Sequence, residues 1–227
     1  MAKGAGLQDC IAELARRYPA GAVLTDPLHL ILWENIGYLI DDERRQVLFA
    51  EFEARIGLTP RGIAEAEGAV LLDIARRGGM RPETRVERWR DIAAIVLTRC
   101  DGDLDGALRA LPPPRARALL KLFPTIGDPG ADRILLFAGV APLPCLDSNG
   151  VRVLARLGLF AEQRSYAASY RAAIAVLKAE GVMERDWLVT AWLALREHGK
   201  TLCKRAGPLC PACALDDICA HVVAKDL

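Results

Sequence analysis

The sequence lacks three features that would assign a class of protein at once. It has no apolar run of about 18 residues, so we expect no helix that spans a membrane. Its 30 Lys and Arg balance 29 Asp and Glu, so no overall basic field indicates a nucleic-acid binder. It has no useful alternation of apolar and polar residues and no internal repeat, which excludes surface strands and repeat architectures. Any contact with DNA must therefore depend on local clusters of charge.

A secretion signal is also missing from the start of the chain. In MAKGAGLQDCIAELARRYP, Asp9 and Glu13 interrupt any apolar stretch, and the pattern is that of an amphipathic helix. We therefore expect a cytoplasmic location, at the nucleoid if the chain is bacterial. Thiols in that compartment stay reduced unless they bind a metal.

What the sequence does contain is helical periodicity. Hydrophobic residues make up 52% of the 227 residues and charged residues 26%, enough for one large or two small packed domains. Apolar residues recur at three- and four-residue spacing between short Gly/Pro connectors such as GLTP, LPPP and GVAPLP. The predicted fold class is all-α. The expected helices are 7–18, 28–38, 42–55, 60–66, 68–77, 84–99, 103–110, 115–122, 129–138, 148–157, 165–180 and 184–198.

Four of the seven cysteines lie in the stretch CKRAGPLCPACALDDIC, with the spacing C-x6-C-x2-C-x5-C. A short loop with Pro and Gly cannot bury four free thiols, and disulfides are not expected in the cytosol. Four thiolates suit either a tetrahedral Zn²⁺ or an iron–sulfur cluster. The residues alone leave both open. The four candidate ligands are Cys203, Cys210, Cys213 and Cys219.

This spacing resembles the iron–sulfur loop of the endonuclease III family of DNA glycosylases. The preceding WLALREHGKTLC, which ends at Cys203, also resembles that family's approach to its first ligand. The resemblance implies a [4Fe–4S] cluster, with zinc as the alternative. Lys204 and Arg205 would then meet a DNA phosphate, or else form only a solvated face. We expect Cys10, Cys100 and Cys145 to be ordinary core residues.

A second feature is the stretch RARALLKLFPTIGDPGADRILLF, in which one apolar helix leads through Pro124 and Gly127 into another. It resembles the helix-hairpin-helix of the same superfamily, whose turn and following helix grip a DNA phosphate through backbone N–H groups. An ordinary corner between two helices is the alternative. The resemblance assigns DNA contact to Thr125, Gly127 and Gly130, with Gly127 free to adopt a positive φ.

The hairpin departs from the family pattern at two positions. Thr125 stands where the first glycine of the turn is usual. Pro129 stands where members with lyase activity carry the lysine that forms a Schiff base. Proline has no amine, so the covalent route and the strand cleavage that follows it are not expected.

Asp147, in CLDSNGVRVLARLG, precedes a predicted helix and suits a helix N-cap. Its distance from Gly127 also matches the superfamily's aspartate, which stabilises the sugar cation as the N-glycosidic bond breaks. The resemblance implies that Asn149 positions this aspartate or the sugar–phosphate. Arg152 contacts either the DNA backbone or the protein. The local sequence resembles the adenine- and thymine-mismatch branches more than endonuclease III itself.

Glu34, in DPLHLILWENIGY, falls on the position of the catalytic glutamate of the adenine branch. A glutamate buried in this apolar segment would have a raised pKa suited to general acid catalysis, whereas one at a helix edge would only reach solvent. Tyr38 and Leu39 stand at the positions of the branch's glutamine pair. Tyr38 is therefore a candidate for the base pocket or for the plug that replaces a flipped base, together with Asn35 and Asn149.

The resemblance covers roughly residues 26–219 and implies two helical domains. The first is a six-helix domain with the hairpin, at 25–141, and the second combines 1–24 with 142–227 around the cluster. We expect Glu34 and Asp147 to face each other across the cleft between them.

The predicted function is a monofunctional DNA glycosylase, a monomer on double-stranded DNA, with no membrane partner. Members that remove adenine usually carry a further C-terminal domain, which we do not expect here, so uracil, mismatched thymine or another lesion is preferred over adenine opposite oxidised guanine. The alternatives are a non-catalytic iron–sulfur DNA-binding protein and a glycosylase with lyase activity.

Overall fold

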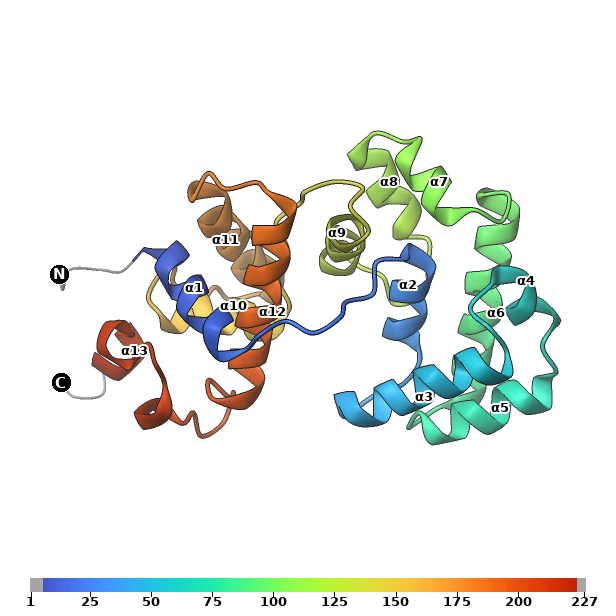
Figure 1. Cartoon of the computed structure of the whole chain (residues 1–227), viewed down its shortest axis with the longest axis horizontal. Coiled ribbons are helices and arrows are strands. Elements are labelled where there is room, and N and C mark those ends of the chain that lie inside the picture. The colour runs from blue at the N-terminus through green and yellow to red at the C-terminus, as the bar shows by residue number, and fades with distance from the viewer. Residues whose placement is uncertain (1–5, 224–227) are drawn as a thin grey trace. The chain divides into compact units, whose positions relative to one another are not determined.

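The computed structural model describes residues 6–223, and the all-α prediction is confirmed for them. They contain no β-strand, only an isolated bridge between Tyr38 and Gly79. The helices (Figure 1) are α1 (Leu7–Arg17), α2 (Pro27–Asn35), α3 (Asp42–Arg55), α4 (Pro60–Glu65), α5 (Gly68–Arg77), α6 (Pro82–Arg99), α7 (Leu104–Arg109), α8 (Pro113–Leu120), α9 (Asp128–Phe137), α10 (Ser148–Arg156), α11 (Tyr166–Ala179), α12 (Arg185–Thr201) and α13 (Ala220–Val223). Two single 3₁₀ turns, η1 (Cys210–Ala212) and η2 (Asp216–Ile218), lie in the cysteine loop.

Local sequence sets where the helices begin. Side-chain oxygens of Asp, Ser or Thr accept a backbone N–H at the start of six helices, which satisfies donors that the helix itself leaves unpaired. These N-caps are Asp26, Asp41, Thr59, Asp103, Asp147 and Ser165. Proline occupies the first or second position of α2, α4, α6, α8 and α9, where its missing N–H costs nothing.

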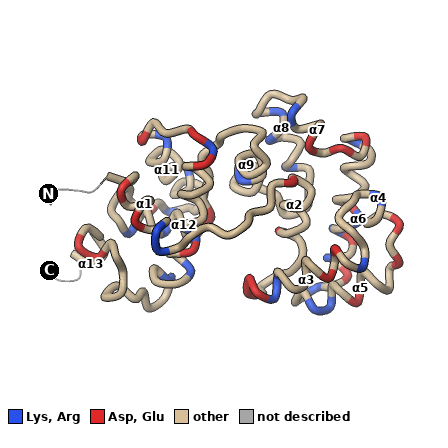
Figure 2. The backbone as a smooth tube through the Cα atoms, in the orientation of Figure 1, with Lys and Arg blue, Asp and Glu red and all other residues tan. Residues whose placement is uncertain are grey.

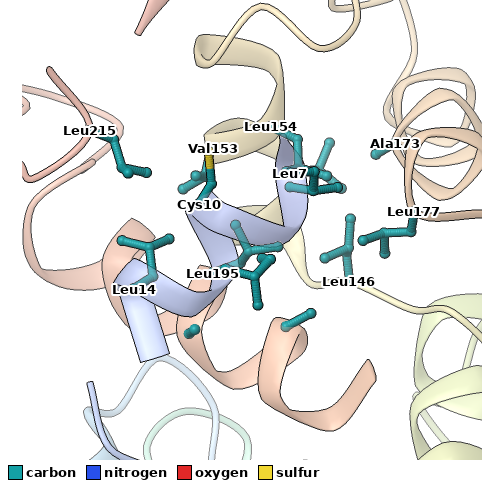
Figure 3. Packing of buried hydrophobic residues seen from close by; sticks show 14 of the residues in the cluster. Leu7, Cys10, Leu14, Leu146, Val153, Leu154, Ala173, Leu177, Leu195 and Leu215 are labelled. Carbon is teal, nitrogen blue, oxygen red and sulfur yellow. The ribbon is translucent and has the colours of Figure 1, made fainter. Parts of the chain in front are cut away.

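The chain divides into two compact units. Unit 1 comprises residues 1–23 and 142–227, and unit 2 comprises residues 24–141. In the described part of unit 1, α12 packs against α1 and α10, and α11 packs against α10. Their apolar faces form one core, part of which is seen in Figure 3. The residues labelled there are Leu7, Cys10, Leu14, Leu146, Val153, Leu154, Ala173, Leu177, Leu195 and Leu215.

In unit 2, α6 packs against α2, α4 and α5, and α9 packs against α2 and α8. Trp89 of α6 is fully buried, and its ring meets Phe52 edge-on with ring centroids 4.8 Å apart. Cys100 is buried in this unit, and Cys10 and Cys145 are buried in unit 1, so the three isolated cysteines are core residues as expected.

Charge is dispersed in both units. Lys and Arg are interspersed with Asp and Glu over both units (Figure 2), so neither unit carries charge of one sign alone. Among residues 6–223, no helix combines the length and the apolar character that crossing a membrane requires.

Candidate functional site

Asp147 is the N-cap of α10, as its sequence context indicates. Its Oδ1 accepts hydrogen bonds from the backbone N–H groups of Asn149 at 2.9 Å and Gly150 at 2.8 Å. Its Oδ2 accepts one from Asn149 Nδ2 at 2.8 Å. The side chain is 26% exposed. Three donors therefore hold the carboxylate in one orientation while part of it stays accessible.

Asn149 links this aspartate to the cysteine loop. Its Oδ1 accepts from Arg152 Nη2 at 2.8 Å, and Arg152 also donates to the carbonyls of Gly199 at 2.7 Å and Cys203 at 3.0 Å. Of the two roles open to Arg152, the structure shows the contact within the protein. A Cβ on Gly199 would lie 2.6 Å from Asn149 Cβ, so only a glycine at this position lets α12 approach α10 this closely.

Two neighbours of Asp147 were missed by sequence reasoning. Arg196 of α12 brings Nε to 3.7 Å from Asp147 Oδ2. Tyr166, at the start of α11, has a raised pKa because it is partly buried and because Asp147 places negative charge nearby. Neither residue stands near Asp147 in the sequence, so only the packing of α10, α11 and α12 could reveal them.

The four cysteines of the loop line one small cavity in unit 1, together with mostly apolar residues. Burial, and in smaller part the neighbouring cysteines, raises the pKa of the Cys213 and Cys219 thiols. Bringing thiolates together in an apolar cavity is therefore unfavourable without a cation among them. Among residues 6–223, no three His, Cys, Asp or Glu side chains form a group suited to one metal ion.

Hydrogen bonds to sulfur support these positions. Arg156 Nη1 lies 3.4 Å from Cys203 Sγ, and the backbone N–H of Leu215 donates to Cys213 Sγ at 3.4 Å. His198 Nε2 lies 3.5 Å from Cys213 Sγ, and burial lowers the pKa of His198 to about 4, so this ring is neutral at pH 7. Donors of this kind orient the ligands of metal centres.

Lys204 and Arg205 are both exposed in the same loop. Their backbone carbonyls accept from Arg156 at 2.7 Å and 3.1 Å, which ties this basic segment to α10. The loop therefore presents two cations on a backbone that is fixed to the helix following Asp147.

The hairpin runs from α8 to α9, and the expectation for its backbone was wrong. Gly127 has φ −94°, whereas Thr125 adopts the left-handed φ of 65°. The turn keeps a left-handed residue but places a β-branched side chain there, which costs on the order of 1–2 kcal/mol. Gly130 lies in the first turn of α9 beside Pro129, and neither glycine needs an unusual conformation.

Asn35 supports this turn from α2. Thr125 Oγ1 donates to Asn35 Oδ1 at 3.2 Å, and Asn35 Nδ2 donates to the carbonyls of Pro124 at 3.1 Å and Ile31 at 3.0 Å. Asn35 is only 4% exposed. A buried amide bound in this way does not suit insertion into DNA, so of the two roles expected for Asn35, plug and base pocket, only the base pocket stays a proposal.

These contacts make a prediction about stability. Thr125→Val keeps the branched side chain but removes the hydroxyl donor from Asn35, so we expect it to lower the free energy of unfolding by about 1–3 kcal/mol. Thr125→Gly also loses the hydroxyl, but it relieves the left-handed strain and should cost less. Urea unfolding of the two variants measures the difference. Equal stability of Thr125→Val and the wild type would contradict the role given to this contact.

Of the two environments left open for Glu34, buried or at a helix edge, the structure shows the helix edge. Its side chain is 39% exposed at the last turn of α2, and Oε1 lies 2.6 Å from Nη1 of Arg133 in α9. Tyr38, just beyond α2, is 55% exposed, and its backbone N–H donates to the carbonyl of Gly78 at 2.8 Å. Tyr38 thus has the exposure that a plug needs.

The structure therefore groups the predicted residues within each unit. In unit 1, Asn149 and Arg152 connect Asp147 to Cys203 by hydrogen bonds. In unit 2, Glu34 and Asn35 both contact the hairpin or the helix after it.

No family model matches the sequence. Curated relatives do match it. The chain is 24% identical over 214 residues to an endonuclease III of Thermotoga maritima, covering 94% of this chain and 92% of that protein. It is 26% identical over 183 residues to a thymine-DNA glycosylase of Aeropyrum pernix, covering 78% and 75%.

Solved structures share the fold. A trapped endonuclease III–DNA covalent intermediate aligns with a TM-score of 0.75 and 19% identity over 97% of both chains. A thermostable thymine-DNA glycosylase aligns with a TM-score of 0.76 and 16% identity, covering 96% of this chain and 95% of the other. The likeness extends over both units and does not choose between the two kinds of enzyme.

Proposed function

We propose that this chain, which belongs to the endonuclease III superfamily, is a DNA N-glycosylase that hydrolyses the bond between a flipped base and its sugar and leaves an abasic site. The observation that carries the proposal is Asp147, oriented by three hydrogen bonds at the start of α10 and still partly exposed. Its position in the sequence is that of the superfamily's aspartate. The sequence and fold relatives support the same activity.

The chemistry assigned to Asp147 is electrostatic. As the C1′–N bond lengthens, its electron pair moves to the base and positive charge develops on the sugar. A carboxylate already held by N–H donors stabilises that charge without having to reorganise. A water oxygen then bonds to C1′, one water proton stays on the new hydroxyl, and the other is passed to the departing base.

Double-stranded DNA is the proposed partner of a monomeric enzyme. The hairpin turn and the first turn of α9 would take a phosphate through backbone N–H groups, with Thr125, Gly127 and Gly130 at the contact. Lys204 and Arg205 would add charge from the cysteine loop. The exposed Tyr38 would fill the space that the flipped base leaves in the duplex.

We propose that the four loop cysteines hold a [4Fe–4S] cluster. The fit rests on four thiols around one mostly apolar cavity, with hydrogen-bond donors at two of the sulfurs. Bound there, the cluster would keep the loop folded and leave no cysteine open for catalysis. The ligands would be Cys203, Cys210, Cys213 and Cys219.

The proposed reaction stops at the abasic site. Pro129 occupies the position of the Schiff-base lysine in the first turn of α9. The nearest lysine in the sequence, Lys121, places Nζ 2.7 Å from Asp128 Oδ1, so its ammonium is engaged in an ion pair. Lys121 also lies eight residues before Pro129, so it is not assigned the role of the missing amine.

The experiment is incubation with duplexes that each carry one lesion or mismatch, analysed with and without alkali. Strand cleavage that appears only after alkali is the expected result. Cleavage without alkali would show lyase activity. Binding with no base release over the whole panel would contradict the proposal and support the non-catalytic DNA-binding alternative.

Asp128 gives a prediction about DNA affinity. It is the first residue of α9, beside the proposed phosphate, and its ion pair with Lys121 lowers its pKa, so it is charged at neutral pH. Asp128→Asn removes this repulsion and should tighten duplex binding by about 3- to 10-fold at low salt. Fluorescence anisotropy measures the affinity. Asp105→Asn, which breaks a similar exposed pair with Arg109 in α7, is the matched control. Unchanged or weaker binding by Asp128→Asn would argue against phosphate contact at this turn.

A further inference from the structure

His198 lies between the N-terminal helix and the cysteine loop. It stands in the last turn of α12, is 2% exposed, and lines the cavity of the four cysteines. Its Nε2 lies 3.5 Å from Cys213 Sγ, and its Nδ1 lies 3.3 Å from the hydroxyl oxygen of Tyr18. All three residues belong to unit 1, in which α1 and α12 pack against each other (Figure 1). The imidazole therefore connects the end of α1 to a proposed ligand.

Tyr18 is itself held in one orientation. It is the C-cap residue of α1, and its ring packs against the apolar core of unit 1. The ring lies tilted against that of His198, with centroids 6.0 Å apart. The hydroxyl of Thr201, one turn along α12 from His198, donates to the Tyr18 oxygen at 3.0 Å. The Tyr18 hydroxyl is thus placed where its own proton can meet only one face of the imidazole.

The chemistry of a ligand thiolate decides which ring nitrogen carries the proton. A cysteine bound to iron accepts hydrogen bonds but has no proton to donate. The buried ring of His198 is neutral at pH 7 and has one N–H. That proton must then lie on Nε2, facing Cys213 Sγ, while Nδ1 accepts from the Tyr18 hydroxyl. The result is a hydrogen-bond relay that runs from the Thr201 hydroxyl through Tyr18 and His198 to the sulfur.

The relay ends at a sulfur that a second donor also reaches. The backbone N–H of Leu215 donates to Cys213 Sγ at 3.4 Å, so together with His198 two N–H groups point at this atom. Such donors draw negative charge from a ligand thiolate and favour the reduced, more electron-rich state of an iron–sulfur centre. The Leu215 donor belongs to the backbone and is present with any side chain. The His198 donor depends on two particular side chains.

We infer that His198 is a positioning residue of the cysteine site, which donates its Nε2–H to Cys213 Sγ under the control of Tyr18 and so raises the reduction potential of the bound cluster. This inference rests on the proposed [4Fe–4S] cluster and names the side chains that tune it. A higher potential makes the loss of an electron to an oxidant less favourable. The relay thus protects the loop that carries Lys204 and Arg205 against oxidation of its metal centre.

The test measures the one-electron midpoint potential of the iron-loaded full chain by voltammetry, in which the electrode supplies the electron. His198→Met is of similar size but lacks the N–H, so at a fixed applied potential its ratio of oxidised to reduced cluster should rise by about 3- to 10-fold. This corresponds to a midpoint lower by roughly 30–60 mV, since a tenfold change is 59 mV for one electron. His198→Gln, which can still donate an N–H, should recover about half of the shift or more.

Tyr18→Phe tests the relay without touching the imidazole. It removes only the hydroxyl that orients His198, so it should lower the potential in the same direction by about half as much as His198→Met. Tyr170→Phe is the matched control, because Tyr170 is a buried tyrosine of the same core whose ring lies near Tyr166 of α11. Its potential should equal that of the wild type. Iron analysis and thermal unfolding show whether each variant keeps the site and the fold, so a shifted potential at full iron separates tuning from a purely structural role.

The outcomes separate the inference from the proposals on which it rests. Base release plays no part in the measurement, so the result stands apart from the glycosylase proposal. A wild-type protein without iron would mean that the proposed cluster is wrong, and the inference would fail with it. If the wild type holds the cluster but His198→Met and Tyr18→Phe keep its potential, or if His198→Gln shifts as far as His198→Met, the cluster stands and the relay is wrong. If His198→Met takes up no iron, Tyr18→Phe decides alone, and an unshifted potential overturns the inference.

Discussion

Asp147→Asn is expected to slow base release by at least about 100-fold, because the substitution removes the negative charge that stabilises the developing sugar cation. Duplex binding should change by less than about 2-fold, since no proposed phosphate contact is lost. Quenched single-turnover assays measure the first quantity, and anisotropy with an abasic-site analogue measures the second. Together they separate chemistry from binding.

The substitution is informative because it keeps the helix start. Asparagine is as good an N-cap as aspartate, and its Oδ1 can accept from the N–H groups of Asn149 and Gly150 as Asp147 does. Asp103→Asn is the matched control, because Asp103 caps α7 and accepts from Gly106 N at 2.9 Å. Base release by Asp147→Asn at the wild-type rate would show that this carboxylate is not the catalytic one.

Cys213→Ala is expected to abolish iron binding and the brown colour of the purified protein, because the remaining three thiols cannot complete the ligand set. It should also weaken duplex binding by about 10-fold, since the loop that carries Lys204 and Arg205 folds around the bound group. Between Cys203 and Cys219 the loop has little regular structure of its own beyond the two 3₁₀ turns η1 and η2. Metal analysis and anisotropy measure the two effects.

Cys100→Ala is the control for this experiment, because Cys100 is a buried cysteine of unit 2 with no place among the proposed ligands. It should retain full iron and full affinity. If metal analysis of the wild-type protein finds zinc and no iron, the four cysteines form a zinc site and the proposed [4Fe–4S] cluster is wrong. Full iron in Cys213→Ala would contradict the ligand set.

Helical periodicity predicted the fold well because most helices bury one apolar stripe. Positions such as Leu188, Ala191 and Leu195 of α12 recur at three- and four-residue spacing and are all buried. The short α13 after the last cysteine has no such stripe and was not predicted. Its place depends on the loop and not on a periodic pattern.

The candidate site was only partly predictable, because its contacts join distant parts of the sequence. The cysteines lie within 17 residues of one another, so their spacing alone indicates a shared centre. Arg133 stands 99 positions after Glu34 (133 − 34), and nothing in either local sequence connects them. The sequence left both a buried and an exposed Glu34 open, because α2 is apolar on most of its surface and periodicity does not show which position stays exposed.

The backbone of the hairpin turn was also not predictable from local sequence, because it depends on a contact with a distant helix. Sequence reasoning assigned the positive φ to Gly127, as the residue with the lowest conformational cost. The structure assigns it to Thr125, whose hydroxyl bonds to Asn35 from another helix. A tertiary hydrogen bond thus offsets a local preference, and no local pattern reports it.

The central claim is that the chain breaks an N-glycosidic bond and no other. The most direct measurement is mass spectrometry of the products from a duplex with a single U·G or T·G pair under single-turnover conditions. We expect free uracil or thymine in an amount equal to the abasic sites formed, with both strands intact. Tight binding of both duplexes with no free base would contradict it.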